Sequence, residues 1–429
     1  MKTNKTLLST AVAFGLLSSA NLANAAGFQL AEYSATGLGR AYAGEAAMAD
    51  NASAQWRNPA MLTYLEGTQV SVGAIYVNPN IDVEGEVRHP MLGNTAASSE
   101  DFAHDAIIPN LYISHRYNDQ LAIGFALGTN YGMETDLGKD FAASHFGNEA
   151  SVISKEANLN LAYQLNEQFS VGGGVRYIIA EGSFGATAPK TNILNLPQGT
   201  TLKYMEGDDT AWGWQVGSAW QINENHRVGF TYKSEVELKL EGHAEGIAFQ
   251  NTPNFYDTGS MALTLPATAE LASFHQLSEQ LALHASINWT DWSSFKELYA
   301  DLDNNPGSMV KVENWEDNYR FAVGATYQLQ PKLALRSGLA YDTSAVSDKN
   351  RTITIPETDR TWLSVGATYD WTQNFTLDAG FTYIIAKDAP IKESRGYESD
   401  DKAQAIGGQF VGETTGNVWL IGVQANYRF

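Results

Sequence analysis

Cysteine is absent from the sequence, and basic residues and long apolar runs are scarce. An exported chain without cysteine has no disulfides, so its stability must come from backbone hydrogen bonds and packing. After residue 25 there is no uninterrupted apolar stretch of about 18 or more residues, which excludes a helical membrane protein. Lysine and arginine total 27 against 48 aspartates and glutamates, giving a net charge of -21. Such an acidic chain lacks the basic patches that bind nucleic acid.

The sequence also lacks a constellation for catalysis or metal binding. Its histidines are scattered without the spacing of metal ligands. Ser293 and Lys296 have the Ser-x-x-Lys spacing of penicillin-recognising enzymes, but the partner motifs of those enzymes are missing. We therefore expect no enzyme, no cofactor and no metal.

Residues 1–25 have the three parts of a secretory signal peptide. Lys2 and Lys5 form the basic start, Leu7 to Leu17 the apolar run, and Ala23-Asn24-Ala25 the small-residue cleavage site. The apolar run is too short to span a membrane as a helix. Cleavage removes the two lysines and changes the net charge of the chain from -21 to -23.

Six short polar turns recur along the chain, and each joins two segments of alternating apolar and polar residues. The turns are Asn118-Asp119-Gln120, Asn166-Glu167-Gln168, Asn223-Glu224-Asn225, Ser278-Glu279-Gln280, Gln330-Pro331-Lys332 and Thr372-Gln373-Asn374. Self-similarity at a regular spacing is typical of repeat architectures. The pattern predicts a series of β-hairpins, separated by longer connections such as 183–206 and 389–414.

Alternation places apolar and polar residues on opposite faces of each predicted strand. Tyr369 and Phe381 lie in the apolar rows of the hairpin around Thr372. In an outer-membrane barrel the apolar row faces lipid and the polar row faces the lumen. A basic residue facing lipid at mid-depth would cost about 2–4 kcal/mol. The strand parity instead predicts that the charged residues face the lumen: Arg176, Glu270, Arg320, Arg336, Asp342 and Asp378.

The six hairpins supply twelve strands, and a first strand near 68–80 and a last strand at 417–429 bring the total to fourteen. We therefore predict an all-β fold, a 14-stranded antiparallel transmembrane β-barrel over residues 67–429, with long extracellular loops. Residues 26–66 are rich in alanine and glycine and do not alternate. They are predicted to form an N-terminal hatch that plugs the lumen, with a disordered periplasmic tail as the alternative.

Several blocks of the chain resemble the FadL family of outer-membrane long-chain fatty-acid transporters. They are the start AGFQLAEYSATGLGRAYAGEAAMADNAS, the Asn-Pro-Ala motif of Asn58, Pro59 and Ala60, TNYG (129–132), LTLPATAEL (263–271), INWTDWSSF (287–295), DNYRFAVG (317–324) and NRTITIPETDRTWLSVG (350–366). The resemblance implies the outer membrane of a Gram-negative bacterium and passive transport of long-chain fatty acids or similar hydrophobic molecules. It also implies that the C-terminal Phe429 is presented to the barrel assembly machinery.

The resemblance assigns roles to individual residues. Phe28 corresponds to an N-terminal aromatic that contacts ligand, and Lys311 to a basic residue of a tight pocket. A second basic pocket residue is replaced by Ala186, and Arg176 is the substitute that we expect. Asn130, Tyr131 and Gly132 correspond to an inward kink of the third strand through which ligand leaves sideways. Asn58, Pro59 and Ala60 correspond to a hatch turn beside that opening.

Apolar residues in the expected loops predict where ligand is first captured. Ile193, Leu194, Leu196, Phe249 and Phe255 form either a ligand-capture groove or a cluster of loop residues packed on one another. Two other functions remain open at this point. One is transport of other hydrophobic compounds such as aromatic hydrocarbons, and the other is a structural or surface-receptor role, for example for a phage.

Overall fold

A computed structural model describes residues 27–394 and 399–429 of the chain, so the predicted signal peptide lies outside the described residues. Within these ranges every strand belongs to one antiparallel sheet. Its strands are β1 (Thr68–His89), β2 (Gly93–Ser99), β3 (Ala106–Arg116), β4 (Leu121–Gly128), β5 (Gly132–Asp136), β6 (Glu149–Gln164), β7 (Phe169–Thr187), β8 (Thr201–Asn223), β9 (His226–Lys233), β10 (Val236–Glu245), β11 (Tyr256–Leu265), β12 (Thr268–Gln276), β13 (Leu281–Thr290), β14 (Glu297–Leu302), β15 (Ser308–Val312), β16 (Asn318–Gln330), β17 (Leu333–Asp342), β18 (Arg360–Asp370), β19 (Phe375–Ala386), β20 (Ala389–Glu393) and β21 (Gln409–Arg428).

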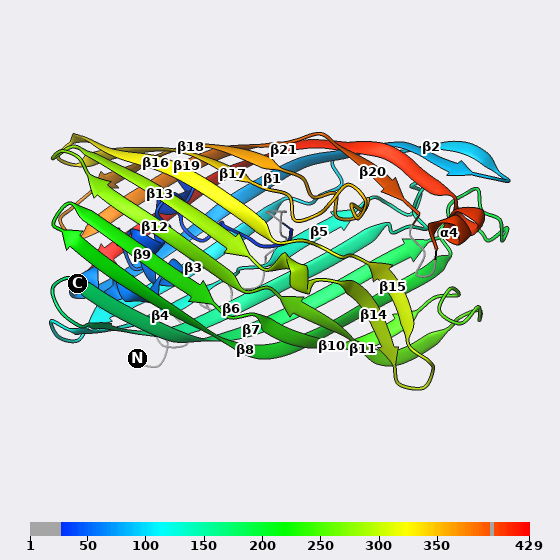
Figure 1. The fold of residues 1–429 in the computed structure, drawn as a ribbon, viewed down its shortest axis with the longest axis horizontal. Coiled ribbons are helices and arrows are strands. Elements are labelled where there is room, and N and C mark those ends of the chain that lie inside the picture. Colours follow the sequence, from blue (N-terminus) through cyan, green and yellow to red (C-terminus); the bar gives the residue numbers. More distant parts are fainter. Residues whose placement is uncertain (1–26, 395–398) are drawn as a thin grey trace, which may run out of the picture.

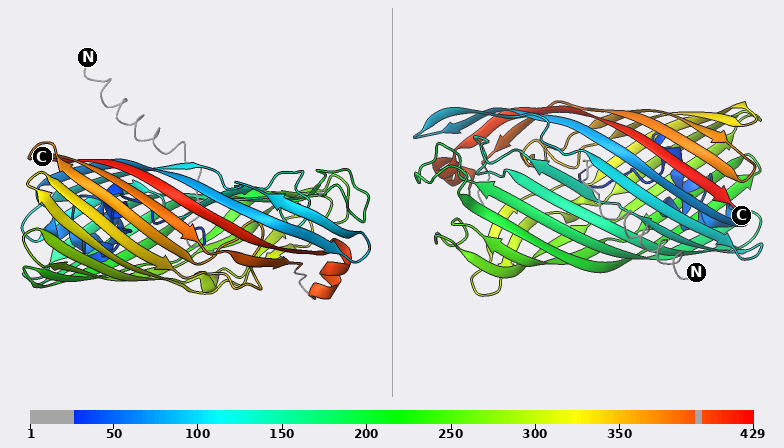
Figure 2. Two further views of the ribbon diagram at one scale, coloured as in Figure 1. Left: turned by 90° about the horizontal axis from the view of Figure 1, so that it is seen from above. Right: turned by 180° about the vertical axis from the view of Figure 1, so that it is seen from behind.

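The sheet closes on itself because β1 pairs with β3 on one side and with β21 on the other. Several wall strands are interrupted and continue as a second segment, as β4 does in β5 and β9 does in β10. Counted in this way, the described residues form the predicted closed barrel of fourteen strands. Figure 1 and Figure 2 show the continuous wall from three directions.

The short polar turns between strands gather at the end of the barrel that holds the C-terminus (Figure 1). The first residue of a turn often stabilises it with its own side chain. The Asn118 Oδ1 atom accepts hydrogen bonds from the backbone N–H groups of Gln120 and Leu121, at 2.9 and 2.8 Å. Asn166 and Thr372 make the equivalent bonds in their turns. Such side-chain bonds explain why asparagine, serine and threonine begin these turns.

The two faces of the wall follow the predicted inversion. Tyr369 and Phe381 are 45% and 41% exposed on the outer surface, whereas Asp378 is 4% exposed inside. Arg176, Glu270, Arg336 and Asp342 are likewise buried, and the Arg320 side chain is 11% exposed. An apolar outer surface on a closed sheet suits a lipid environment, in which no strand edge is left unpaired.

Residues 27–66 lie inside the half of the barrel that holds the short turns (Figure 1), and we call this segment the hatch. It forms the short helices α2 (Ala35–Leu38), η1 (Glu45–Ala47), α3 (Ala54–Arg57) and η2 (Pro59–Tyr64). Glycines of the wall allow its backbone to come close. A Cβ atom added to Gly172 of β7 would lie 2.5 Å from the Ala60 nitrogen. The hatch therefore fits against the wall at positions where no side chain is present.

The opposite end of the barrel is more regular than the sequence predicted. The connection expected at 183–206 is strand at both of its ends, because β7 and β8 continue to pair up to Thr187 and Thr201. The connection expected at 389–414 contains β20, the helix α4 (Asp400–Gly407) and the start of β21. A further short helix, η3 (Trp292–Ser294), lies between β13 and β14. In the described ranges no helix is long and apolar enough to cross a bilayer.

Candidate functional site

The third wall strand is broken between β4 and β5, at residues 129–131. At this break the start of the hatch runs alongside the wall as a short strand. The Leu30 N–H donates to the Asn130 carbonyl and the Gly132 N–H donates to the Phe28 carbonyl, both at 2.7 Å. Gln29 and Tyr131 form an antiparallel bridge between these two bonds. The hatch thereby takes the place of a neighbouring strand at the predicted kink.

The other side of the break is bonded to β6. The Tyr131 N–H donates to the Ser154 hydroxyl at 3.1 Å, and the Ser154 N–H donates to the Tyr131 carbonyl at 3.0 Å. Backbone groups at membrane depth must be bonded, because an unpaired one costs several kcal/mol in lipid. If residues 28–30 moved away, the Asn130 carbonyl and the Gly132 N–H would lose their protein partners.

Phe28 anchors the start of the hatch in an aromatic cluster. Its ring contacts Trp292, Phe295, Trp315 and Tyr131, with ring centroids 4.5, 5.6, 5.9 and 6.2 Å away. All five side chains are buried. Aromatic pairs at these separations add about 0.5–1.5 kcal/mol each beyond the burial of their surface. The cluster therefore holds the hatch strand against the kink.

A cavity of about 540 Å³ opens at the end of the barrel opposite the short turns, and we call it the outer cavity. Its volume lies within the range of about 300–1,000 Å³ that is usual for small-molecule sites. Ile193, Leu194 and Leu196 line it together with Phe184 and Ala186. Three of the residues predicted for a ligand-capture groove therefore share one largely apolar cavity.

Lys311 of β15 lies at the inner limit of the outer cavity, with 7% of its side chain exposed. Its Nζ atom forms an ion pair with the Glu393 Oε1 atom of β20 at 2.9 Å. The same ammonium donates to the Thr354 hydroxyl at 3.2 Å and to the Phe146 carbonyl at 3.3 Å. It also lies 5.2 Å from the centroid of the Phe184 ring. Lys311, predicted to be a basic residue of a tight pocket, thus already has a carboxylate partner.

A second, smaller cavity of about 30 Å³ lies on the other side of Lys311, and we call it the inner cavity. Lys311 and Phe184 line both cavities. The inner cavity also touches Phe28 and Met133, the residue that follows the kink. Lys311 therefore stands between a space open to the outside and a space beside the hatch strand and the kink.

Arg176 is not part of either cavity lining. It faces the lumen as predicted, but Glu156 of β6 binds its guanidinium through two hydrogen bonds of 2.8 Å. The Asn130 amide donates to the same carboxylate at 2.7 Å. The structure therefore does not bring Arg176 together with Lys311. Arg176 and Ala186 share the inner face of β7 but lie ten residues apart along it, so Ala186 reaches the outer cavity while Arg176 lies lower in the lumen, beside the kink.

Phe249 and Phe255 do not line the outer cavity. Their rings stack on one another with centroids 5.7 Å apart, and they are 6% and 8% exposed. Of the two alternatives for these residues, the structure favours packing within the loop. Phe249 lies only next to the cavity, because its neighbour Ala248 is a lining residue.

The hatch turn of Asn58, Pro59 and Ala60 packs against β7 and β8, while the kink is contacted by residues 28–30. The Asn58 amide donates to the Ser218 carbonyl of β8 at 3.0 Å, and its Oδ1 atom accepts from the Ala60 N–H at 2.9 Å. This differs from the expected position beside the opening. At the last residue of β4 before the kink, the hatch residue that approaches the wall is Trp56, whose ring would be 3.1 Å from a Cβ atom added at Gly128.

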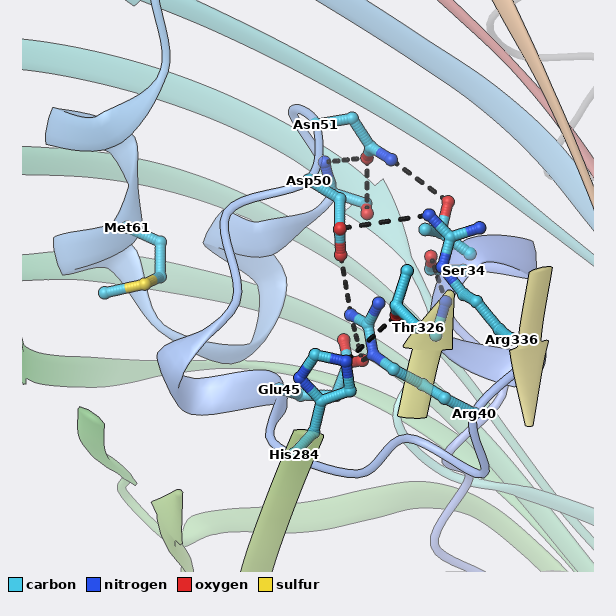
Figure 3. Close-up of polar contacts among 12 residues, drawn as sticks. Ser34, Arg40, Glu45, Asp50, Asn51, Met61, His284, Thr326 and Arg336 are labelled. Carbon is cyan, nitrogen blue, oxygen red and sulfur yellow. Dashed lines mark hydrogen bonds and ion pairs between the residues drawn. The ribbon is translucent and has the colours of Figure 1, made fainter. Parts of the chain in front are cut away.

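Charged groups fix the hatch to itself and to the wall (Figure 3). The Arg40 Nη2 atom lies 2.7 Å from both the Glu45 and the Asp50 carboxylates. Arg336 of β17 approaches Asp50 at 3.9 Å. Arg57 reaches Glu270 of β12 at 3.2 Å. The two pairs with the wall, Arg336–Asp50 and Arg57–Glu270, join segments distant in sequence, and no local sequence signal predicts them.

Two histidines hold the C-terminal end of α4 over the outer cavity. The His145 Nε2 atom lies 2.7 Å from the Gly407 carbonyl, and the His89 Nε2 atom lies 3.1 Å from the Ile406 carbonyl. The His89 Nδ1 atom accepts from two backbone N–H groups, so Nε2 carries the proton. Burial lowers the pKa of His145, against the opposing effect of its bond to Gly407. A neutral His145 is therefore compatible with this contact.

Comparisons with known proteins agree with this architecture. A family model described as "Outer membrane protein transport protein (OMPP1/FadL/TodX)" matches residues 16–429. A "Long-chain fatty acid transport protein" of Escherichia coli O6:H1 is 33% identical over 459 aligned positions, which cover 100% of this chain and 99% of that protein.

Two solved structures share the fold. A FadL homologue from Pseudomonas aeruginosa superposes with a TM-score of 0.82 at 22% identity, covering 94% of this chain and 100% of that one. The CymD monoaromatic hydrocarbon channel superposes with a TM-score of 0.64 at 17% identity, covering 94% and 99% of the two chains.

Proposed function

The chain belongs to the OMPP1/FadL/TodX family of outer membrane transport proteins, and we propose that the compounds it transports are long-chain fatty acids. Membership makes it an outer membrane channel for hydrophobic compounds in a Gram-negative bacterium, and not an enzyme. The fatty acid enters from outside and leaves sideways through the wall at the kink.

The observation that carries the proposal is the position of Lys311 between the outer cavity and the Phe28 cluster. A fatty acid needs an apolar space for its tail and a cation for its carboxylate, because a buried carboxylate must be paired. The outer cavity supplies the apolar space, and Lys311 is a buried cation at its inner end.

Lateral release follows from the hydrogen bonds at the kink. Residues 28–30 are bound there by two backbone hydrogen bonds and by the Phe28 ring. A ligand arriving in the inner cavity competes with Phe28 for the same space. Displacing Phe28 withdraws the hatch strand and opens the wall beside residues 129–131, so that the ligand can enter the membrane.

A disulfide between Gln29→Cys and Tyr131→Cys tests the route. Bridge partners in antiparallel strands have Cα atoms about 4.5–5.5 Å apart, which suits a disulfide. Because the chain has no cysteine of its own, no other pairing competes. We expect cells with the oxidised double variant to lose labelled oleate uptake and to regain it after reduction. The two single variants are the controls, and normal uptake through the cross-linked barrel would refute the route.

Transport of uncharged hydrocarbons is the second candidate, and it is favoured by the ion pair of Lys311. The Glu393 carboxylate neutralises Lys311, so the outer cavity already suits an uncharged guest. The double variant Lys311→Met/Glu393→Gln removes both charges together and leaves neither unpaired. If the cargo is a fatty acid, this variant loses oleate uptake and keeps toluene uptake. Equal oleate uptake by wild type and variant would favour the hydrocarbon function.

A further inference from the structure

We propose that Glu393 competes with the ligand carboxylate for Lys311. When the ligand carboxylate replaces Glu393 at Lys311, the passage from the outer to the inner cavity opens. The inference rests on the proposed function, since it requires a carboxylate ligand in the outer cavity. It assigns to Glu393 the role of selecting the ligand class.

Glu393 holds two elements together with one carboxylate. Its Oε1 atom pairs with Lys311 of β15, and its Oε2 atom accepts a hydrogen bond of 2.9 Å from the Ile353 N–H. Ile353 belongs to the segment between β17 and β18, next to Thr354, whose hydroxyl also binds Lys311. The Glu393 side chain is 4% exposed, so contacts with the protein, and not with water, hold it in place.

This arrangement lies at the partition between the two cavities. Lys311 lines both of them, Glu393 lines the outer one, and Thr354 and Ile355 line the inner one. As long as Glu393 joins Lys311 to the Ile353 segment, these side chains occupy the way between the cavities. We call this set of contacts, made by Lys311, Glu393, Ile353 and Thr354, the latch.

A fatty acid carboxylate at Lys311 cannot be accommodated without moving Glu393. Two carboxylates on one buried ammonium leave an uncompensated negative charge, and an unpaired buried charge is strongly unfavourable. Glu393 must therefore leave Lys311 when the ligand carboxylate arrives, and it then releases the Ile353 N–H. An alcohol of the same chain length carries no charge and cannot replace Glu393.

The test is a binding comparison on the purified full-length barrel in detergent. Oleate and oleyl alcohol are titrated against wild type and Glu393→Gln, whose amide oxygen still accepts from the Ile353 N–H. We expect Glu393→Gln to bind oleate about tenfold more tightly or better, a change of about 1.4 kcal/mol. Oleyl alcohol affinity should stay the same, because the alcohol does not compete for Lys311.

The control is Asp348→Asn, which removes one negative charge from an exposed partner of Arg351 at the same end of the barrel. It should leave both affinities unchanged. A second readout is hydrogen exchange at the Ile353 amide, which oleate should accelerate in wild type and oleyl alcohol should not. Thermal unfolding verifies that each variant is folded.

The outcomes separate the two proposals. If wild type binds oleate and Glu393→Gln binds it equally or more weakly, the latch is overturned and the proposed function stands. An equal gain for oleate and oleyl alcohol would also overturn it, since the effect would then not depend on charge exchange. Failure of wild type to bind oleate at all would refute the proposed function, and with it the latch.

Discussion

Adding one methyl group at Gly172 should displace the hatch, while the same change one residue later should not. A Cβ atom at Gly172 would lie 2.5 and 2.6 Å from the Ala60 nitrogen and the Pro59 carbonyl carbon. These are backbone atoms that no side-chain rotation can move aside. The Cβ of Gly173, on the opposite face, would meet nothing closer than 3.5 Å.

The magnitude follows from the cost of overpacking, which is typically about 1–3 kcal/mol. That cost applies only to the state with the hatch in place, so Gly172→Ala should raise the population of the displaced state by about fivefold to a hundredfold. Replacing glycine in a strand also reduces the backbone entropy of the unfolded chain. Gly173→Ala includes this effect without the clash, and it is therefore the matched control.

A single cysteine in the hatch reports its position, because the natural chain has none. Ala54→Cys is suitable, since Ala54 is 6% exposed and reacts with a maleimide only when the hatch moves. We expect faster labelling in Gly172→Ala than in the parent, and no change in Gly173→Ala. Identical labelling rates in the two glycine variants would refute the conclusion that wall glycines define the seat of the hatch.

Three further predictions concern other parts of the site. Phe28→Ala should destabilise the bound position of the hatch strand by about 3–5 kcal/mol. This would appear as faster hydrogen exchange of the Gly132 amide, and unchanged exchange would contradict the anchoring role of the ring. Phe429→Ala should lower the amount of assembled barrel in cells but not the yield of refolding in detergent, because Phe429 is 73% exposed. An equal loss in both measurements would indicate a structural role. Burial lowers the pKa of His145, with Glu393 and His89 as its charged or titratable neighbours. The stability that the buried neutral ring contributes is therefore present above the unfolded pKa of about 6.5 and is lost as the pH falls towards the lower folded value. The hydrogen-exchange protection factors of the 400–407 amides should therefore fall on acidification in wild type, and this pH dependence should be absent in His145→Gln.

The sequence by itself determined the barrel. A period of two decides which side chains share a face, and a charge in lipid is expensive, so parity alone assigned Tyr369 to the outside and Asp378 to the inside. The turns were also predictable, since Asn118 and its equivalents stabilise them with bonds that reach only two or three residues. Each of these properties depends on neighbours in the sequence.

The site, in contrast, was decided by the tertiary structure. Position in the chain and resemblance pointed to Lys311 and Arg176 as a pair of cations, but the register of the closed sheet separates them and gives each a carboxylate partner. Glu393 meets Lys311, and Phe28 meets the kink, only because the barrel closes and the hatch folds into it. Contacts between residues so far apart in the chain depend on strand register and closure, which local patterns do not encode.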